Sequence, residues 1–281
     1  IFCLLAQEQE AKACPHLLQM FGAFSDDVDT YLVTELADGG DLFSFTANSR
    51  KPLVEEQVRS FTWQLLQALQ YLHERRIGHR DISLENALLS RGVVKVMDFG
   101  MACQTHAEDL ALRYFRAVGK DMYRGPECYL PKESEVNVTA PDSARHGDVV
   151  FLPVANNCLA EVRLPSDAVP GTTCTAEIAG YTVPPLDVFS AGVCAFILRW
   201  QVPPWKLAHL SDRYFHFVHH SGPLGLETLL KTWRKPLPGS EAMSLLKSML
   251  DANPARRPTV QECLAHDWFA PERVDVCSRS L

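Results

Sequence analysis

The sequence lacks several features that would assign it to other protein classes. No apolar run reaches membrane-spanning length, because the best candidate, Val188–Leu198, stops at Arg199. The nine cysteines are scattered, odd in number and form no C-x-x-C pair, which favours a reduced, intracellular (cytoplasmic) protein over a disulfide framework. Basic residues number 27 against 34 acidic ones, and a net charge of −7 argues against nonspecific nucleic-acid binding. We therefore expect neither a membrane nor a nucleic acid as a partner.

A start methionine and a signal peptide are also missing. The first residue is Ile1, and we interpret the chain as a fragment that lacks its natural N-terminus. The composition is ordinary for a globular protein, with 47% hydrophobic and 22% charged residues. A length of 281 residues suits one large domain or two modest ones, and either can bury a substantial core.

Hydrophobic periodicity predicts helices around a short β region. Apolar residues recur at three- and four-residue steps from Val54 to Leu72, which predicts one face of a long helix. Residues 187–200 are nearly all apolar and should form a buried helix. The β region has predicted strands at residues 29–35 and 93–97, with a turn at 37–41 after the first strand.

Residues 128–180 have a different composition. They contain five prolines, one phenylalanine and no tryptophan. Short runs at 149–152 and 160–164 are strand-like. We predict a loop-rich insertion with a hairpin, bounded by helical segments.

Three motifs follow one another near the middle of the chain. Residues 79–86 read His-Arg-Asp-Ile-Ser-Leu-Glu-Asn, which matches H-R-D-x-x-x-x-N. Asp98-Phe99-Gly100 comes next, and Gly125-Pro126-Glu127 differs by one residue from A-P-E. In these motifs and their order, the chain resembles the catalytic domain of eukaryotic protein kinases, over roughly residues 1–270.

The resemblance implies an α+β, protein-kinase-like fold that is mostly the helical C-lobe. Residues 1–36 would be a remnant of the β-rich N-lobe, comprising the end of the family's C-helix, two strands and the start of the hinge. Residues 37–269 would be the C-lobe, with the insertion at about 128–180. Residues 270–281 would form a C-terminal tail.

The resemblance also implies catalytic roles. Asp81 would orient the substrate hydroxyl and accept its proton, and Asn86 and Asp98 would hold Mg²⁺, which prefers oxygen ligands. The family's structural partners are present too. Asp187 would brace the catalytic loop from a buried helix, and Glu127 would pair with Arg257, a type of buried pair that is costly to break.

On the nucleotide side, the resemblance places ATP against residues 31–41. Thr34 would be the gatekeeper, and Glu35 and Ala37 would offer backbone contacts to adenine. Leu88 would form the floor under the base. Asp41 either binds the ribose or resembles the acidic contact of kinases that prefer arginine upstream of the acceptor.

The chain departs from the family at two facing positions. Ser83 stands where serine/threonine kinases carry a lysine, and Lys120 stands where they carry a threonine. We predict a reciprocal exchange, in which the ammonium of Lys120 reaches the transferred phosphate. The alternative is that Lys120 points to solvent and Ser83 is a lost function.

The segment between the second and third motifs, residues 98–127, corresponds to the activation segment of the family. It lacks a threonine just before Gly119. Arg80 marks kinases in which a phosphate often orders this segment. We expect instead phosphorylation of Tyr114, or a standing acidic substitute near Arg80 such as Glu108 or Asp109.

The resemblance therefore predicts ATP-dependent phosphoryl transfer to serine or threonine hydroxyls of protein substrates. The alternative is a pseudokinase that acts as a scaffold or allosteric partner, favoured by Ser83 and by the absence of a G-x-G-x-x-G loop and a V-A-I-K lysine from the sequence. The insertion either docks a partner or substrate, or is a tolerated surface insertion.

We predict that the 281-residue chain alone has negligible kinase activity, because the glycine-rich loop and the strand lysine position the ATP phosphates. The measurement is phosphate transfer to a generic protein substrate, by this chain and by a longer form that includes upstream residues. Robust activity from the chain alone would contradict the prediction.

Overall fold

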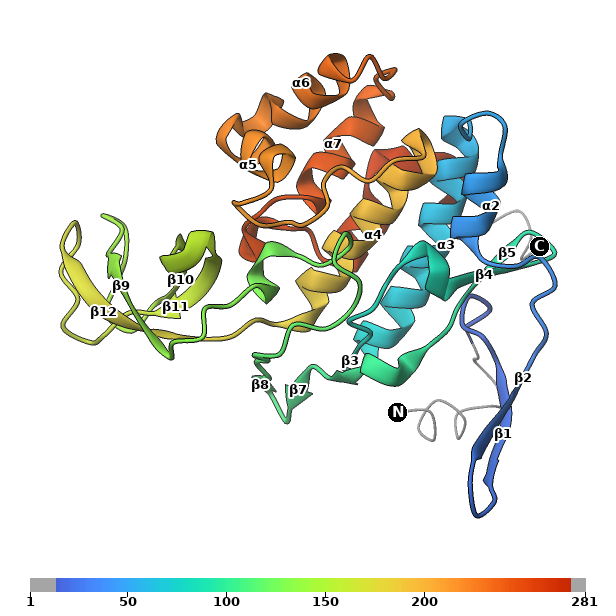
Figure 1. Cartoon of the computed structure of the whole chain (residues 1–281), viewed down its shortest axis with the longest axis horizontal. Helices are drawn as coiled ribbons and strands as arrows, with labels where there is room; N and C mark the ends of the chain where they lie inside the picture. Colours follow the sequence, from blue (N-terminus) through green and yellow to red (C-terminus); the bar gives the residue numbers. More distant parts are fainter. Residues whose placement is uncertain (1–13, 274–281) are drawn as a thin grey trace.

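The structure, a computed structural model, describes residues 14–273 (Figure 1). The predicted C-helix end at residues 1–5 lies outside the described residues, as does most of the predicted tail. The labelled helices of the described residues are α2 Leu42–Asn48, α3 Glu55–Glu74, α4 Val183–Trp200, α5 Arg213–His220, α6 Gly225–Thr232, α7 Ser240–Met249 and α8 Val260–Ala265. Its strands are β1 Met20–Ser25, β2 Thr30–Thr34, β3 Ile77–Gly78, β4 Ala87–Ser90, β5 Val93–Val96, β6 Cys103–Gln104, β7 His106–Ala107, β8 Leu110–Ala111, β9 Glu135–Thr139, β10 Val149–Pro153, β11 Leu159–Arg163 and β12 Thr173–Ile178. Helices and small antiparallel sheets occupy separate regions, which is the α+β arrangement predicted.

The core forms where α3 and α4 pack against each other. The predicted apolar face of α3 is buried at Val58, Leu65, Leu66, Leu69 and Leu72. Val54 is 59% exposed, because it lies at the N-cap position, before the first turn of the helix. The two helices form the platform on which the loops between β3 and β5 rest.

Helix α4 begins at Val183, earlier than the predicted start at residue 187. Two prolines lie in its first turn, where a missing N–H leaves no intrahelical hydrogen bond unmade. The longer helix has the length and composition of a membrane-crossing one, so the expectation that no segment reaches that length was wrong. However, 83% of its 18-residue window is buried inside the structure, against α3 and α7, as in a core helix.

Small antiparallel sheets position the loops near the motifs. The β4–β5 hairpin packs on α3, and β3 pairs with β6. The predicted strands at 29–35 and 93–97 are confirmed as β2 and β5. Strand β2 pairs with β1 in a hairpin at the lower right of Figure 1.

The segment predicted to be a loop-rich insertion is instead a four-stranded antiparallel sheet. Its strand order is β10-β11-β12-β9, and it lies at the left of Figure 1, away from the β1–β2 hairpin. The two strand-like runs are β10 and β11, but the pairing of β12 with β9 was missed. Val136, Val138, Ala160, Val162 and Ile178 are among the residues that give the sheet a small apolar core of its own. The insertion is therefore a folded unit.

The predicted ion pair between Glu127 and Arg257 is confirmed. Both side chains are 0% exposed, and two N–O distances of 2.5 and 2.7 Å make the pair bidentate. The guanidinium also donates to the carbonyls of Pro185, Asp251 and Ala252 and lies 4.6 Å from the ring of Phe189. The pair ties the Pro-Glu segment to the start of α4.

We predict that Arg257→Ala lowers the free energy of unfolding by about 3–5 kcal/mol, because it leaves the Glu127 carboxylate buried without a partner. Urea unfolding measures the change. The matched control is Lys247→Ala, which breaks a half-exposed pair with Glu227 and should cost about 1 kcal/mol or less. Equal losses in the two variants would contradict the prediction.

Candidate active site around Asp81

A buried carboxylate from α4 holds the loop that carries the first motif. Asp187 is 0% exposed, and its Oδ2 accepts the backbone N–H of His79 at 2.9 Å while its Oδ1 accepts that of Arg80 at 2.8 Å. The Nε2 of His73 lies 2.9 Å from the same carboxylate. Arg80 has φ of +67°, a left-handed conformation that a non-glycine residue adopts only when its surroundings enforce it. The predicted bracing by Asp187 is thus a set of hydrogen bonds to the backbone.

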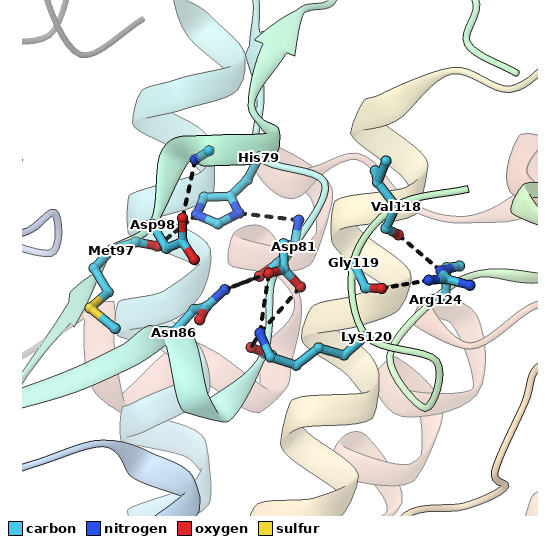
Figure 2. Close-up of polar contacts among 11 residues, drawn as sticks. His79, Asp81, Asn86, Met97, Asp98, Val118, Gly119, Lys120 and Arg124 are labelled. Atoms are coloured by element: carbon cyan, nitrogen blue, oxygen red, sulfur yellow. Dashed lines mark hydrogen bonds and ion pairs between the residues drawn. The ribbon is translucent and has the colours of Figure 1, made fainter. Parts of the chain in front are cut away.

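The ring of His79 joins two motifs. The backbone N–H of Asp81 donates to Nδ1 at 3.3 Å, so Nε2 carries the proton and donates to the carbonyl of Met97 at 3.0 Å (Figure 2). Burial lowers the pKa of His79, which favours the neutral ring that these two hydrogen bonds require. The ring also lies 5.2 Å from that of Phe99. The imidazole of His79 therefore connects the first motif to the residue before Asp98.

Asp81 is the centre of the polar cluster in Figure 2. The Nδ2 of Asn86 donates to its carboxylate at 2.9 Å and to its backbone carbonyl at 2.8 Å. The ammonium of Lys120 lies 3.1 Å from its Oδ2 and also donates to the hydroxyl of Ser83 at 3.0 Å. The structure therefore brings the two exchanged positions, 83 and 120, into direct contact, and Lys120 does not simply point to solvent.

A residue that the sequence analysis did not single out holds the loop that carries Lys120. Arg124 donates to the carbonyls of Val118 and Gly119, at 2.9 and 2.5 Å, and pairs with Asp121 at 2.8 Å. Gly119 has φ of +83°, and a Cβ there would lie 2.7 Å from the carbonyl oxygen of Arg80. Close approach and backbone conformation both require glycine at this position. An arginine that satisfies carbonyls carries no distinctive sequence signal.

Asp98 lies on the other side of the cluster, next to Met97. It has φ of +63°, its carboxylate accepts the N–H of Gly100 at 3.2 Å, and the residue is exposed. Asn86 is linked to it through the backbone, because the N–H of Met97 donates to the carbonyl of Asn86 at 2.9 Å. With its nitrogen committed to Asp81, Asn86 presents its amide oxygen on the opposite side.

The five residues predicted to contact the nucleotide lie along β4 and the segment beside it. Asp41 forms an antiparallel bridge with Leu88, two residues after Asn86. The carboxylate of Glu35 accepts the ammonium of Lys95 at 2.8 Å, and Lys95 pairs with Leu88 across the hairpin. Thr34 is the last residue of β2, and Ala37, which is half-buried, lies three residues later.

The side chain of Asp41 caps α2. Its two oxygens accept the N–H of Ser44 at 2.7 Å and the Ser44 hydroxyl at 2.8 Å. Partial burial opposes ionisation, but these hydrogen bonds lower the pKa of Asp41 below its ordinary value. The carboxylate is therefore charged and already engaged, a role that sequence analysis missed although an aspartate before a helix is a strong capping signal.

Arg80 is not near the acidic residues that were expected to replace a phosphate. Asp109 lies 3.4 Å from Arg76, which also donates to the carbonyl of Glu108. Arg80 instead donates to the carbonyl of Met101 at 2.6 Å, and its guanidinium lies 4.8 Å from the ring of Tyr114. The prediction for Glu108 and Asp109 was wrong, because the turn between β7 and β8 directs them to the other arginine.

Comparisons with known proteins show that the chain is similar to protein kinases. The family model of the protein kinase domain matches residues 6–141 and 177–269, and its gap falls within the inserted sheet. The chain is 29% identical over 261 residues to calcium-dependent protein kinase 24 of Arabidopsis thaliana, covering 91% of this chain and 34% of that protein. It is 26% identical over 255 residues to human NUAK family SNF1-like kinase 2, covering 90% of this chain and 31% of that protein. Over 115 residues it is 41% identical to serine/threonine-protein kinase PLK4 of Drosophila grimshawi, covering 40% of this chain and 15% of that protein. The chain thus spans between 15% and 34% of the length of these relatives.

We predict that Arg124→Gln makes the bond after Lys120 easier to cleave with trypsin. Loss of the carbonyl contacts lowers the free energy of local opening, and each 1.4 kcal/mol lost speeds cleavage about tenfold. Time-resolved mass spectrometry of the fragments measures the rate at this bond. Arg59→Gln, which breaks a distant pair with Glu272, is the control, and an Arg124→Gln rate equal to that of the control would contradict the role of Arg124.

Proposed function

The chain belongs to the protein kinase family, and we propose that it transfers the terminal phosphoryl group of ATP to serine or threonine hydroxyls of protein substrates. The observation that carries the proposal is the cluster of Asp81, Asn86 and Lys120, in which a carboxylate, an amide and an ammonium converge within 3.1 Å. Relatives named as serine/threonine kinases support the choice of hydroxyl. We also propose that the protein works inside the cell, since the seven cysteines of the described residues are all free.

We propose that Asp81 orients the acceptor hydroxyl and takes its proton. The carboxylate side chain is 13% exposed and is held by the amide of Asn86, so it faces the site in one orientation. A carboxylate held in this way can accept a proton from the hydroxyl as its oxygen attacks the phosphoryl group. This positioning, more than covalent chemistry, is what phosphoryl transfer requires of a protein.

Asn86 and Asp98 fit a magnesium ion. They offer an amide oxygen and a carboxylate from two segments that the Met97–Asn86 hydrogen bond holds together. Both are the hard oxygen ligands that Mg²⁺ prefers. When bound, the ion neutralises charge on the ATP phosphates.

Lys120 would supply the charge that the family places two residues after the catalytic aspartate. Its ammonium lies 3.0 Å from Ser83, so the hydroxyl and the amine have exchanged positions while the pair of groups beside Asp81 is kept. The Lys120 side chain is 37% exposed, which leaves it able to turn from Asp81 toward a phosphoryl oxygen. The ammonium of Lys120 would then stabilise the negative charge on the transferred phosphoryl group.

The nucleotide would lie along residues 34–41 and β4. Glu35 and Ala37 would contact adenine through their backbone, which leaves the Glu35 carboxylate free to keep its pairing with Lys95. Thr34 would line the back of this site and Leu88 its floor. A role for Asp41 in binding ribose would require a rearrangement, because its carboxylate would have to release Ser44.

A pseudokinase that acts as a binding module is the second candidate. It is favoured by one observation: Ser83, which replaces the expected lysine, is buried with 1% exposure and cannot reach a substrate without movement. In this case the hydrogen bond from Lys120 to Ser83 would be structural.

Transfer from radiolabelled ATP to a mixed protein substrate separates the two functions. It is measured for this chain and for any longer natural form that contains it, each beside an Asp81→Asn variant. We expect Asp81→Asn to lower the rate by a factor of about 10² or more, as for removal of a catalytic base. Nucleotide binding with no transfer in any form would support the pseudokinase.

We further predict that, in a form with measurable activity, Lys120→Ala lowers kcat by about tenfold or more. The double variant Ser83→Lys with Lys120→Thr should restore much of the rate, since it returns the two groups to their usual positions. The matched control is Lys132→Ala, which removes an exposed lysine elsewhere. An unchanged kcat for Lys120→Ala would mean that the exchange has no catalytic role.

A further inference from the structure

The inserted sheet is packed against the Pro-Glu segment. Strand β11 contacts the 3₁₀ helix Pro126–Cys128, and Leu159 at its start belongs to the main core. Leu130 packs both against the core of the sheet and against the cluster that contains Tyr181. The sheet is thus anchored on the side of the molecule where the activation segment, residues 98–127, returns to the helices.

The chain that leaves the sheet pairs with the activation segment. Tyr114 and Tyr181 exchange two backbone hydrogen bonds of 2.9 Å each, and the Tyr181 hydroxyl donates to the carbonyl of Arg116 at 2.6 Å. Gly180 has φ of +72°, and a Cβ there would lie 2.8 Å from the carbonyl oxygen of Tyr114. The approach is therefore as close as a backbone without a side chain allows.

An ion pair adds a second connection, from inside the sheet. Arg113 donates through the same nitrogen to Glu161 on β11 and to the carbonyl of Gly180, at 3.0 Å each. The side chain of Glu161 is 13% exposed and that of Arg113 is 27% exposed. Burial raises the pKa of Glu161 and the neighbouring guanidinium opposes this rise, so Arg113 is the group that favours the charged carboxylate. A carboxylate buried this far depends on its partner.

These contacts lie directly before the residues that complete the site. Four residues separate Tyr114 from Gly119 in the sequence, and Lys120 follows. The ring of Tyr114 also receives the guanidinium of Arg80, the residue next to Asp81. The activation segment is thus held from the sheet on one side and from the catalytic loop on the other, at the place where a phosphate was expected.

We propose that Glu161 and Arg113 are positioning residues, through which the inserted sheet orders residues 113–120 without a phosphate on the activation segment. Contacts with the sheet then order the activation segment, a role that in the family often belongs to a phosphate paired with the arginine at the position of Arg80. The part of the proposal that concerns catalysis rests on the proposed function; the ordering does not.

Amide hydrogen exchange tests the ordering on the 281-residue chain. In Glu161→Gln, we expect exchange in peptides that cover residues 112–118 to speed up about tenfold or more, because the pairing at Tyr114 opens more often. Arg113→Gln should give the same change without altering the sheet, and Arg113→Lys should restore most of the protection. Glu227→Gln, which breaks the distant pair with Lys247, is the matched control and should leave residues 112–118 unchanged.

Exchange at residues 112–118 that stays at the wild-type rate in both Glu161→Gln and Arg113→Gln would overturn the proposal. So would a tenfold increase on treatment of the wild-type protein with a phosphatase, since the order would then depend on phosphate. In an active form, Arg113→Gln should raise the KM for the acceptor peptide, and Arg113→Lys should restore it. The exchange result stands even if no form transfers phosphate, so failure of the proposed function is distinguishable from failure of this proposal.

Discussion

The carboxylate of Asp187 is the interaction on which the rest of the site depends. It is fully buried in the middle of the core, yet its two oxygens accept two backbone N–H groups and lie against His73. A charge in such a place is tolerated only when hydrogen bonds replace its hydration. Those hydrogen bonds keep Arg80 in its left-handed conformation, which in turn sets the direction of Asp81.

The remaining contacts of the site extend outward from this carboxylate. His79 connects the loop of residues 79–86 to Met97, and Asn86 and Lys120 both donate to the carboxylate of Asp81 (Figure 2). The exchange of serine and lysine between positions 83 and 120 preserves the groups and changes only the loop that carries each one. Because the inserted sheet contacts Arg113 and Tyr114, shortly before Lys120, the charge beside Asp81 is coupled to a part of the chain outside the motifs.

Sequence could predict two kinds of feature in this structure: contiguous patterns, and residue pairs that the family resemblance implies. The catalytic loop, Asp98 and the helices α3 and α4 are contiguous patterns, and the pair of Glu127 with Arg257 followed from the family resemblance. The contact between Ser83 and Lys120 was also within reach, because the two positions face each other in the family fold.

What sequence could not predict depends on contacts between distant segments. In β9, valines alternate with Glu135, Asn137 and Thr139, which is the pattern of a half-buried strand, so the strand itself could have been predicted but its pairing could not. Its partner β12 is more than 30 residues away, so no local signal connects the two strands. The pair of Arg113 with Glu161 and the carbonyl contacts of Arg124 likewise exist only once the chain has folded.

The central claim is that this site phosphorylates hydroxyl groups of proteins. Its most direct measurement is mass spectrometry of a peptide mixture offering serine, threonine and tyrosine acceptors, after incubation with Mg²⁺ and ATP and an active form of the protein. The account predicts phosphate on serine and threonine, and none when Asp81 is replaced by asparagine. Phosphate confined to tyrosine, or phosphate that persists in the asparagine variant, would contradict it.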